Sequence, residues 1–537
     1  MKHVNSIATR MQDNAPELEP QIPVKSWKGL KGRGGGYQLA LTNLTTYRAT
    51  TANTAGIWPF TNASTAPLIG SPIGRHHDTL QPVGCDPLSW FDAGLIFNPS
   101  QFVMGNPSVG KSTLIRKEAM GVMATGTNVL VPGDVKDEYV EEIRENGGQV
   151  IYLGPGRETM NILDPGEGLA AVEAIKASRK VPTDLRDQLV RDLLADIQSR
   201  RSNMVCSLIE IHRSEKISGL ERGIVEAGVK WLTDNHDGTP ILADLLNAVR
   251  AAHLDLMVAA NAADAEGITQ DLPRYRRYTE NLENDLNSLC SGGTLGAMFN
   301  GPTTKPLHRD RSVCIAISGI ESTQTDMLAA AYIASWSAAF GMINVAHAMA
   351  DAKLEKHQRF LVILDEFWQP LTSGPGMVQR ADAMTRLNRS QCVGIIYSTH
   401  TIKDLERIRS EEDRAAAYGI IERCGMIMLG GLSRRELNRV AAVWPLNRAE
   451  VNMIASWNAP RKIKRRKARP GTVQRGRKNP GLGKFCIKLP ESGGIPIQTT
   501  LTATEWALDL HDTDGRIRKT EDGDLEVIND DMEEAAA

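Results

Sequence analysis

Two glycines, a lysine and a serine fall at the spacing G-x-x-x-x-G-K-[ST] in the first quarter of the chain. The stretch reads Gly105-Asn106-Pro107-Ser108-Val109-Gly110-Lys111-Ser112, and Thr113 follows it. The glycines allow a backbone turn tight enough for successive N–H groups to point inward and hold a polyphosphate. We expect Lys111 to contact the β- and γ-phosphates and the Ser112 hydroxyl to bind Mg²⁺. The spacing therefore predicts a loop that binds a nucleoside triphosphate such as ATP, together with Mg²⁺.

A pair of carboxylates, Asp365 and Glu366, directly follows the apolar run at residues 360–364. We expect Asp365 to support the Mg²⁺ shell from a neighbouring strand end, through water or Ser112. Glu366 is placed to orient and deprotonate an attacking water. Taken alone, an apolar run before Asp-Glu is as often structural as functional, but its position after a phosphate-binding loop favours hydrolysis. The loop around Gly110 and these carboxylates should face one another across adjacent strand ends.

Polar residues also end the apolar run at 393–397, where Ser398 precedes Thr399 and His400. Thr399 or His400 could sense the γ-phosphate from that strand end, or His400 could be an ordinary hydrogen-bonded loop residue. Three arginines, Arg380, Arg386 and Arg389, share one expected helix ahead of this strand. An arginine that reaches the nucleotide of a neighbouring subunit would stabilise the transition state. Arg389 is the first choice and Arg386 the second, with surface arginines of no such role as the alternative.

Apolar runs that alternate with helical stretches surround these residues. The run at 101–104 precedes the loop, a helix is expected at 114–120, and further strands are expected at 128–131, 149–153, 313–317, 360–364, 393–397 and 426–429. Strands that alternate with helices indicate an α/β fold with a mostly parallel sheet. Long helical stretches replace β-branched runs from residue 168 to about 287. We therefore expect an all-α subdomain inserted in the α/β core.

The chain has 537 residues, which is too long for one ordinary core. We expect a flexible N-terminal arm at 1–36, a small β-rich region at 37–99, an ATPase core in two parts at 100–166 and 301–506, the inserted helical subdomain at 167–300, and an acidic, disordered tail at 507–537.

Composition is that of a soluble globular protein, with 41% hydrophobic residues and a formal net charge of −2. Bulk charge therefore predicts no polyanionic partner, and any contact with nucleic acid must be local. The seven cysteines are scattered and form no C-x-x-C pair, which argues against a zinc site or disulfide framework and fits a reducing cytoplasm. The N-terminus lacks the apolar core of a signal peptide.

One stretch, residues 327–350, contains no Asp, Glu, Lys or Arg and is long enough to span a bilayer. It is rich in alanine and includes Ser335, Asn344 and His347. Because it lies directly before an expected core strand, a buried helix between two strands explains it better than a membrane span.

A basic cluster lies between residues 461 and 478. Its ten basic residues are Arg461, Lys462, Lys464, Arg465, Arg466, Lys467, Arg469, Arg475, Arg477 and Lys478. No aromatic residue is interleaved, so the cluster could bind phosphates without reading bases. It could equally contact anionic lipid or a protein partner, or be a solvated loop.

Together the motifs resemble the conjugative type IV secretion ATPases (TraC-like) of the HerA/FtsK superfamily, especially actinobacterial members, over about residues 45–506. The pieces that follow the loop are Gly133-Asp134-Val135-Lys136-Asp137-Glu138-Tyr139, Met160-Asn161-Ile162-Leu163-Asp164-Pro165, Gly296-Ala297-Met298-Phe299-Asn300-Gly301, Leu364-Asp365-Glu366-Phe367-Trp368 and Thr399-His400. The chain departs from the family in two respects. The family usually has Gln at the position of His400, and its N-terminal docking domain is larger than the region before the loop in this chain.

The resemblance implies a RecA-like P-loop NTPase core that works as a ring, commonly a hexamer, and hydrolyses ATP. Carried over by position, Lys111 and Ser112 bind the nucleotide, Asp365 partners Mg²⁺ and Glu366 is the catalytic base. Arg389 falls where the family has an arginine ahead of its Thr-Gln strand end. The protein would then be cytoplasmic, peripheral at the inner face of the cell membrane, with inner-membrane channel subunits as partners.

Three functions stay open. The first is the ATPase motor of a conjugation or type IV secretion apparatus, which energises channel assembly or the transfer of DNA or protein. The second is a HerA/FtsK-type DNA translocase or coupling protein that binds DNA or a relaxase–DNA complex. The third is a nucleotide-gated scaffold that binds ATP but barely hydrolyses it. The presence of both Lys111 and Glu366 argues against the scaffold, since binding alone would not require a base.

Overall fold

The computed structural model describes residues 67–374, 376–382, 393–408, 410–458, 480–490, 492–507, 517–519 and 525–527. The chain divides into two compact units, and the larger, Pro67–Thr499, contains all the site residues discussed below. The expected N-terminal arm, Arg386, Arg389 and the basic cluster at 461–478 lie outside the described residues.

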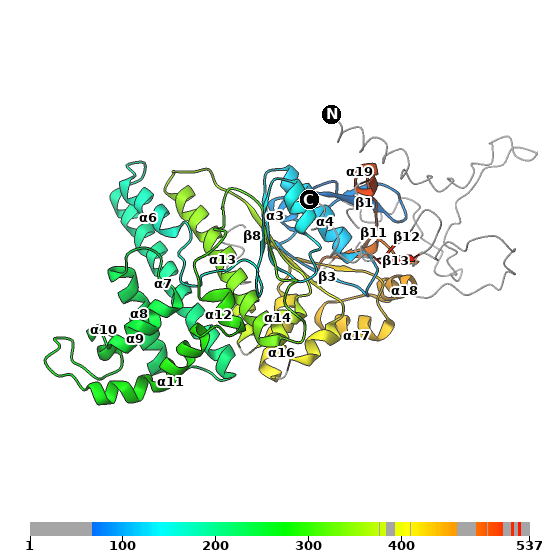
Figure 1. Ribbon diagram of the computed structural model, residues 1–537. Coiled ribbons are helices and arrows are strands. Elements are labelled where there is room, and N and C mark those ends of the chain that lie inside the picture. The colour runs from blue at the N-terminus through cyan, green and yellow to red at the C-terminus, as the bar shows by residue number, and fades with distance from the viewer. Residues whose placement is uncertain are drawn as a thin grey trace, which may run out of the picture. The chain divides into compact units, whose positions relative to one another are not determined.

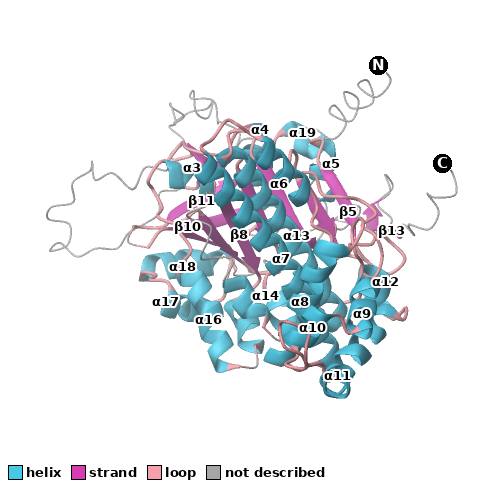
Figure 2. Ribbon diagram, turned by 90° about the vertical axis from the view of Figure 1, so that its left-hand side faces the viewer, coloured by secondary structure: helices cyan, strands magenta, loops and turns pink. Residues whose placement is uncertain are grey.

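Seven parallel strands form one side of an eleven-stranded sheet, in the order β9-β3-β8-β7-β4-β6-β5, with β5 at the edge. They are β3 (Ser100–Met104), β4 (Asn128–Asp134), β5 (Gln149–Tyr152), β6 (Val313–Ala316), β7 (Phe360–Leu364), β8 (Val393–Thr399) and β9 (Met426–Leu429). Every residue of β3, β7 and β8 is buried. Strands of a parallel sheet are buried on both faces, which explains their unbroken apolar runs (Figure 2).

Four antiparallel strands continue the sheet beyond β9. In order from β9 they are β10 (Lys484–Lys488), β11 (Ile495–Thr499), β1 (Pro72–His76) and β2 (Pro82–Gly84). Segments that precede and follow the parallel strands in the sequence therefore pair with each other on one side of the sheet. The prediction of a mostly parallel α/β sheet is confirmed.

Strand order corrects one expectation about the site. β8 lies between β3 and β7, with Met104 paired to Thr399 and Leu364 paired to Tyr397. The phosphate-binding loop and the Asp365-Glu366 pair therefore do not follow adjacent strands, as the sequence led us to expect. Crossover connections can leave a space in a parallel sheet, and a strand from later in the chain can fill it. As a consequence, His400 lies between the two motifs.

All the described elements between β5 and β6 are helices: α6 (Gly168–Ala177), α7 (Thr183–Arg213), α8 (Gly219–Asn235), α9 (Leu242–Ala251), α10 (Leu254–Ala259), α11 (Leu272–Cys290) and α12 (Thr294–Phe299). Figure 1 shows α6 to α11 gathered at one end of the unit. One apolar core extends without a break from Phe102 in the sheet to Ile209 and Ile224 in these helices. The helices thus share the core of the sheet, and a division into separate domains stays a prediction.

The uncharged stretch forms α13 (Thr325–Asp351), which connects β6 to β7. By length and composition this helix could cross a membrane, but 78% of its most apolar window is buried inside the fold. It packs against α6, α7, β4 and α14 (Trp368–Ser373). The prediction of a buried helix between two strands is confirmed.

The remaining described elements are α3 (Pro87–Asp92), α4 (Lys111–Ala124), α5 (Val140–Glu145), η1 (Ile402–Arg407), α16 (Glu411–Glu422), α17 (Arg434–Val443), α18 (Arg448–Trp457) and α19 (Ala503–Ala507). In the segment expected to be a disordered tail, two short strands, β12 (Ile517–Lys519) and β13 (Leu525–Val527), pair antiparallel.

Candidate active site

The glycine-rich loop connects the end of β3 to the start of α4. Gly110 has φ +92°, a left-handed conformation that glycine adopts without strain, and α4 begins at the next residue. At Gly105 a side chain would meet Val109, since a Cβ atom would lie 2.8 Å from Val109 Cγ2. The start of α4 therefore lies directly after this turn, where the positive end of the helix favours an anion.

Neighbouring strand ends support this loop. The Gly483 N–H, directly before β10, donates a hydrogen bond of 2.9 Å to the Val109 carbonyl oxygen. Asn106 Nδ2 also donates to Oδ1 of Asn458, the residue that follows α18, at 2.9 Å. The loop is therefore held from the turn before β10 and from the end of α18.

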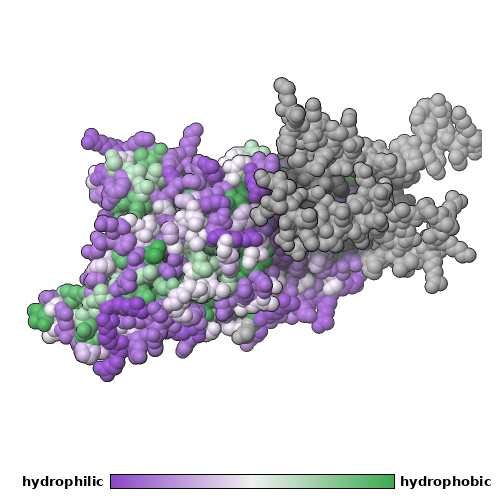
Figure 3. All heavy atoms as spheres, in the orientation of Figure 1, coloured by the Kyte–Doolittle hydropathy of each residue, from purple (hydrophilic) through white to green (hydrophobic). Residues whose placement is uncertain are grey.

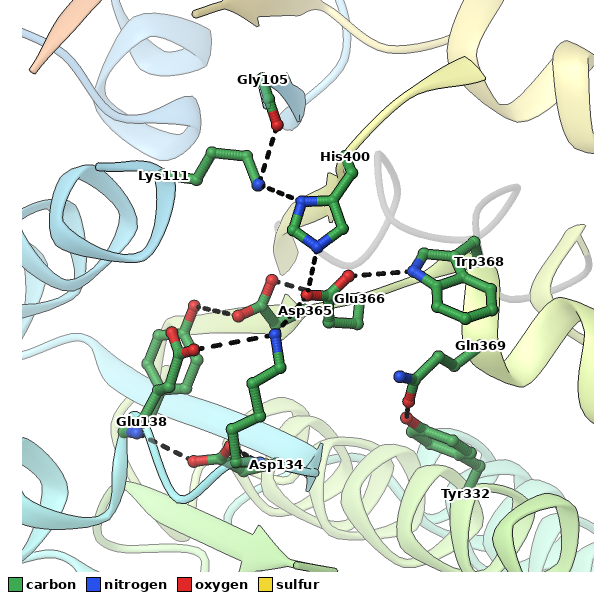
Figure 4. Close-up of polar contacts among 12 residues, drawn as sticks. Gly105, Lys111, Asp134, Glu138, Tyr332, Asp365, Glu366, Trp368, Gln369 and His400 are labelled. Atoms are coloured by element: carbon green, nitrogen blue, oxygen red, sulfur yellow. Dashed lines mark hydrogen bonds and ion pairs between the residues drawn. The ribbon is translucent and has the colours of Figure 1, made fainter. Parts of the chain in front are cut away.

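Lys111, His400 and Glu366 form a line of contacts across three strand ends (Figure 4). Lys111 Nζ donates to the Gly105 carbonyl oxygen at 2.9 Å and lies 2.6 Å from His400 Nδ1. The other ring nitrogen, His400 Nε2, lies 3.0 Å from Glu366 Oε1. Burial lowers the pKa of Lys111, although the Glu366 and Asp365 carboxylates oppose this shift. One histidine thus connects the lysine expected to bind phosphate to the carboxylate expected to act as base.

Glu366 is 5% exposed, and both of its carboxylate oxygens have partners. Oε1 is also 2.5 Å from Lys136 Nζ, and Oε2 accepts a hydrogen bond of 2.9 Å from Trp368 Nε1. Burial would raise the pKa of Glu366, but hydrogen bonds from His400 and Lys136, together with the positive charge of Lys136, hold it well below its usual value. Glu366 is therefore ionised, which a proton acceptor must be.

Asp365 lies beside this line and is held from the end of β4. Its Oδ2 accepts a hydrogen bond of 3.1 Å from the Tyr139 hydroxyl, and its Oδ1 accepts one of 2.9 Å from the Glu366 N–H. Burial and the nearby Asp365 raise the pKa of Glu138, and a hydrogen bond from Ser112 opposes that shift. Ser112 and Asp365 are thus linked through the neighbouring residues Glu138 and Tyr139.

The donor set fits Mg²⁺. Among the described residues, no group of three or more His, Cys, Asp or Glu side chains could hold a metal ion alone. Mg²⁺ in nucleotide sites commonly takes one or two protein oxygens and fills its shell with water and phosphate oxygens. The Ser112 hydroxyl and the Asp365 carboxylate are oxygens of this kind.

The structure brings together four of the predicted residues, Lys111, Asp365, Glu366 and His400, with Ser112 linked to them through Glu138. Arg389 lies outside the described residues. Arg380 contacts α7, where its Nη2 donates to Ser207 Oγ at 2.7 Å and to Glu210 Oε2 at 3.2 Å.

The sequence motifs assign no chemical role to the turn after β4, which supplies Lys136, Glu138 and Tyr139 to the site. The sequence feature that points to this turn is the pattern Gly133-Asp134-Val135-Lys136-Asp137-Glu138-Tyr139, which belongs to the family resemblance. Lys136 and Glu366 are 230 residues apart, so no local spacing could connect them.

The site combines a glycine-rich loop after β3, a carboxylate pair after β7 and a polar residue at the end of β8, the strand between them. This arrangement is that of a RecA-like P-loop NTPase fold. No protein-family model and no curated protein matches the chain. A solved structure, VirB4 of Thermoanaerobacter pseudethanolicus, is similar over 82% of this chain and 98% of its own, with a TM-score of 0.55 and 14% identity.

Two further structures match at lower TM-scores. The plasmid coupling protein TrwB in complex with ADP and Mg²⁺ matches 75% of this chain and 86% of its own, with a TM-score of 0.42 and 12% identity. The cytoplasmic domain of the type VII secretion ATPase EccC of Thermomonospora curvata matches 83% of this chain and 32% of its own, with a TM-score of 0.29 and 11% identity. The likeness to VirB4 alone confirms the predicted fold, which this chain shares with a type IV secretion ATPase.

Proposed function

We propose that this protein is an ATP-hydrolysing motor of a conjugation or type IV secretion apparatus. The observation that carries the proposal is the direct contact of Lys111 and Glu366 with the two ring nitrogens of His400, at 2.6 Å and 3.0 Å. The group proposed to bind phosphate and the group proposed to accept a proton thus contact opposite sides of one side chain. The similarity to VirB4 suggests the apparatus in which the motor works.

The hydrolysis follows from the roles of these groups. The N–H groups of the loop and Lys111 would hold the β- and γ-phosphates of ATP, so Lys111 would exchange its contacts with Gly105 and His400 for phosphate oxygens. Glu366 would take a proton from a water whose oxygen attacks the γ-phosphorus, and the bond to the β–γ bridging oxygen would break. Ser112 and Asp365 would hold Mg²⁺, which would neutralise charge on the phosphates. An arginine from a neighbouring subunit, with Arg389 as the first choice, would complete the site.

A DNA translocase or coupling protein is the second candidate, favoured by the ten basic residues at 461–478. Binding to a phosphate backbone through such a cluster should weaken steeply as salt increases. Neutralising Arg465, Arg466 and Lys467 together should then abolish most of the affinity for DNA, measured by fluorescence anisotropy of a labelled duplex at two salt concentrations. Equal affinity before and after neutralisation would exclude this cluster as the DNA-binding element.

Particle mass and turnover together test the motor. We expect ATP and Mg²⁺ to assemble the chain into a closed ring, commonly a hexamer, measured by light scattering after gel filtration. ATP turnover in the presence and absence of DNA separates the two candidates. Assembly without DNA stimulation favours the secretion motor, and DNA-stimulated turnover favours the translocase. A chain that stays monomeric with ATP, or that binds ATP without turnover, would contradict both.

A further inference from the structure

Lys136, from the turn after β4, makes a direct ion pair with the proposed catalytic base. Its Nζ lies 2.5 Å from Glu366 Oε1, and its side chain is 47% exposed whereas that of Glu366 is 7% exposed. The lysine therefore extends from the solvent side of the site to a carboxylate that solvent scarcely reaches. A carboxylate this buried is stable in its charged form only when a cation pairs with it.

The backbone around Lys136 is fixed. Asp134 accepts hydrogen bonds from the N–H groups of Lys136 and Tyr139, at 3.1 Å and 2.8 Å. Asp137 accepts a further bond of 2.7 Å from the Ser318 hydroxyl, beyond the end of β6. Hydrogen bonds therefore hold the turn at the ends of β4 and β6, and this fixes the position from which the Lys136 side chain extends.

The backbone of Glu366 has a strained conformation, which contacts with neighbouring residues must hold in place. Its φ of +45° lies in the left-handed region that residues other than glycine rarely adopt. Surrounding contacts must maintain a conformation of this kind, and strain of this sort gathers at active sites. The contacts come from three elements: Lys136 after β4, His400 after β8 and Trp368 at the start of α14.

Lys136 also faces a second carboxylate. Glu138 Oε1 lies 4.0 Å from Lys136 Nζ, and Ser112 at the start of α4 is near enough to Glu138 to oppose the rise in the pKa of its carboxyl. The turn thus contacts both halves of the site: Lys136 contacts the proposed base, and Glu138 contacts the loop that binds phosphate. The remaining residue of this group, Tyr139, contacts Asp365.

We propose that Lys136 is a positioning residue for hydrolysis, which holds the Glu366 carboxylate in place for the attacking water. This inference rests on the proposed ATPase function. It makes the turn after β4 a third part of the active site, besides the phosphate-binding loop and the Asp365-Glu366 pair. Because Lys136 acts through Glu366, its removal should slow the chemical step and leave nucleotide binding intact.

The test compares Lys136→Met with a matched control, Lys305→Met. Lys305 forms an ion pair of the same length, 2.5 Å, with Glu158, and its side chain is 48% exposed, but the Glu158 carboxylate pairs with Lys305 and the Tyr152 N–H and not with a residue of the site. For both variants and the wild type, kcat and KM come from phosphate release at varied ATP with Mg²⁺. The Kd for ATP comes from calorimetry, and the melting temperature is measured in parallel.

We expect Lys136→Met to lower kcat at least about tenfold, with the Kd for ATP within about twofold of wild type. Lys136→Arg should recover part of kcat because it restores the positive charge, and Lys305→Met should match wild type. If Lys136 had only a structural role, its loss would distort the site and weaken ATP binding as well. A lower kcat with an unchanged Kd for ATP would therefore distinguish positioning from folding.

Equal kcat for Lys136→Met and Lys305→Met would overturn the role of Lys136 and leave the proposed function standing. A loss confined to the Kd for ATP would also overturn it, since Lys136 would then be a nucleotide ligand. No hydrolysis by the wild type would overturn the proposed function and this inference together.

Discussion

The chemistry of the site depends on a histidine with two partners. His400 contacts Lys111 through Nδ1 and Glu366 through Nε2, so it links the groups expected to bind phosphate and to accept a proton. A side chain in this position responds directly when Lys111 moves to a phosphate oxygen. The sensor role predicted for this strand end is therefore chemically reasonable, and it stays a prediction until tested.

Two substitutions of His400 should show whether the site needs the hydrogen bonds of this side chain or only its volume. His400→Gln keeps a side chain that donates and accepts hydrogen bonds, as glutamine does at this position in the resembling family, so we expect ATP turnover within about tenfold of wild type. His400→Ala removes both contacts, and we expect a loss of about a hundredfold or more. Phosphate release at saturating ATP measures both variants. Equal activity of the alanine and glutamine variants would show that His400 has no polar role.

At the scale of elements, the site depends on where strands end. β3 and α4 fix the phosphate-binding loop, β7 presents Asp365 and Glu366, β8 presents His400 between them, and β4 supplies Lys136 and Tyr139. The carboxyl ends of parallel strands meet at one edge of the sheet, which is where α/β folds bind ligands.

The two ends of α4 allow a matched test of the loop. Gly110 precedes the helix with φ +92°, and Gly126 follows it with φ +86°. A Cβ at Gly126 meets nothing within 4 Å, and one at Gly110 meets nothing closer than 3.6 Å. Both Gly→Ala variants should lose about 1–2 kcal/mol of stability, because alanine disfavours the left-handed conformation.

Only Gly110→Ala should weaken the binding of ATP, because only that glycine shapes the phosphate-binding loop. Calorimetric titration with ATP and urea unfolding measure the two effects separately. If Gly126→Ala reduces ATP affinity as much as Gly110→Ala does, the effect reflects general destabilisation and not the loop.

The end of β4 should make stability depend on pH. Burial raises the pKa of Asp134 from 3.8 to about 7, although hydrogen bonds from the N–H groups of Tyr139 and Lys136 oppose the shift. Between pH 4 and pH 7 the folded state therefore binds more protons at this group than the unfolded state does. The contribution of Asp134 to the free energy of unfolding must then fall as pH rises through this range, and level off above it.

Asp134→Asn removes the titrating group and should remove that contribution. Between pH 5 and pH 7, we expect the free energy of unfolding of the wild type to fall by about 2 kcal/mol more than that of the variant. Urea unfolding of both proteins at the two pH values measures the difference. Parallel changes in the two proteins would show that Asp134 stays ionised in the folded state.

The parts of the site that the sequence predicts are those with a local signal. The spacing from Gly105 to Ser112 and the apolar run before Asp365 each occupy a few consecutive residues, and β3, α4 and β7 form where expected. The position of β8 between β3 and β7 depends on crossover connections, which leave no local pattern. Lys136 could not be predicted as a partner of Glu366, because only the sheet topology brings the ends of β4 and β7 together.

At the scale of the whole molecule, the compact unit Pro67–Thr499 buries α13, which by length and composition could cross a membrane. α13 is covered by α6, α7, α14 and β4. The face in Figure 3 is mostly hydrophilic where it is coloured, with hydrophobic residues scattered over it. Attachment to the inner face of a membrane, which the family resemblance implies, would then depend on partner subunits or on the basic segment at 461–478, and not on α13.

The central claim is that this chain hydrolyses ATP with Glu366 as the base, and phosphate release by the purified protein tests it most directly. We predict Mg²⁺-dependent turnover in the wild type and in the control Glu158→Gln, whose carboxylate pairs with Lys305 away from the site. Glu366→Gln should keep its affinity for ATP and lose at least about a hundredfold in turnover. Turnover by Glu366→Gln equal to that of the wild type would contradict the account.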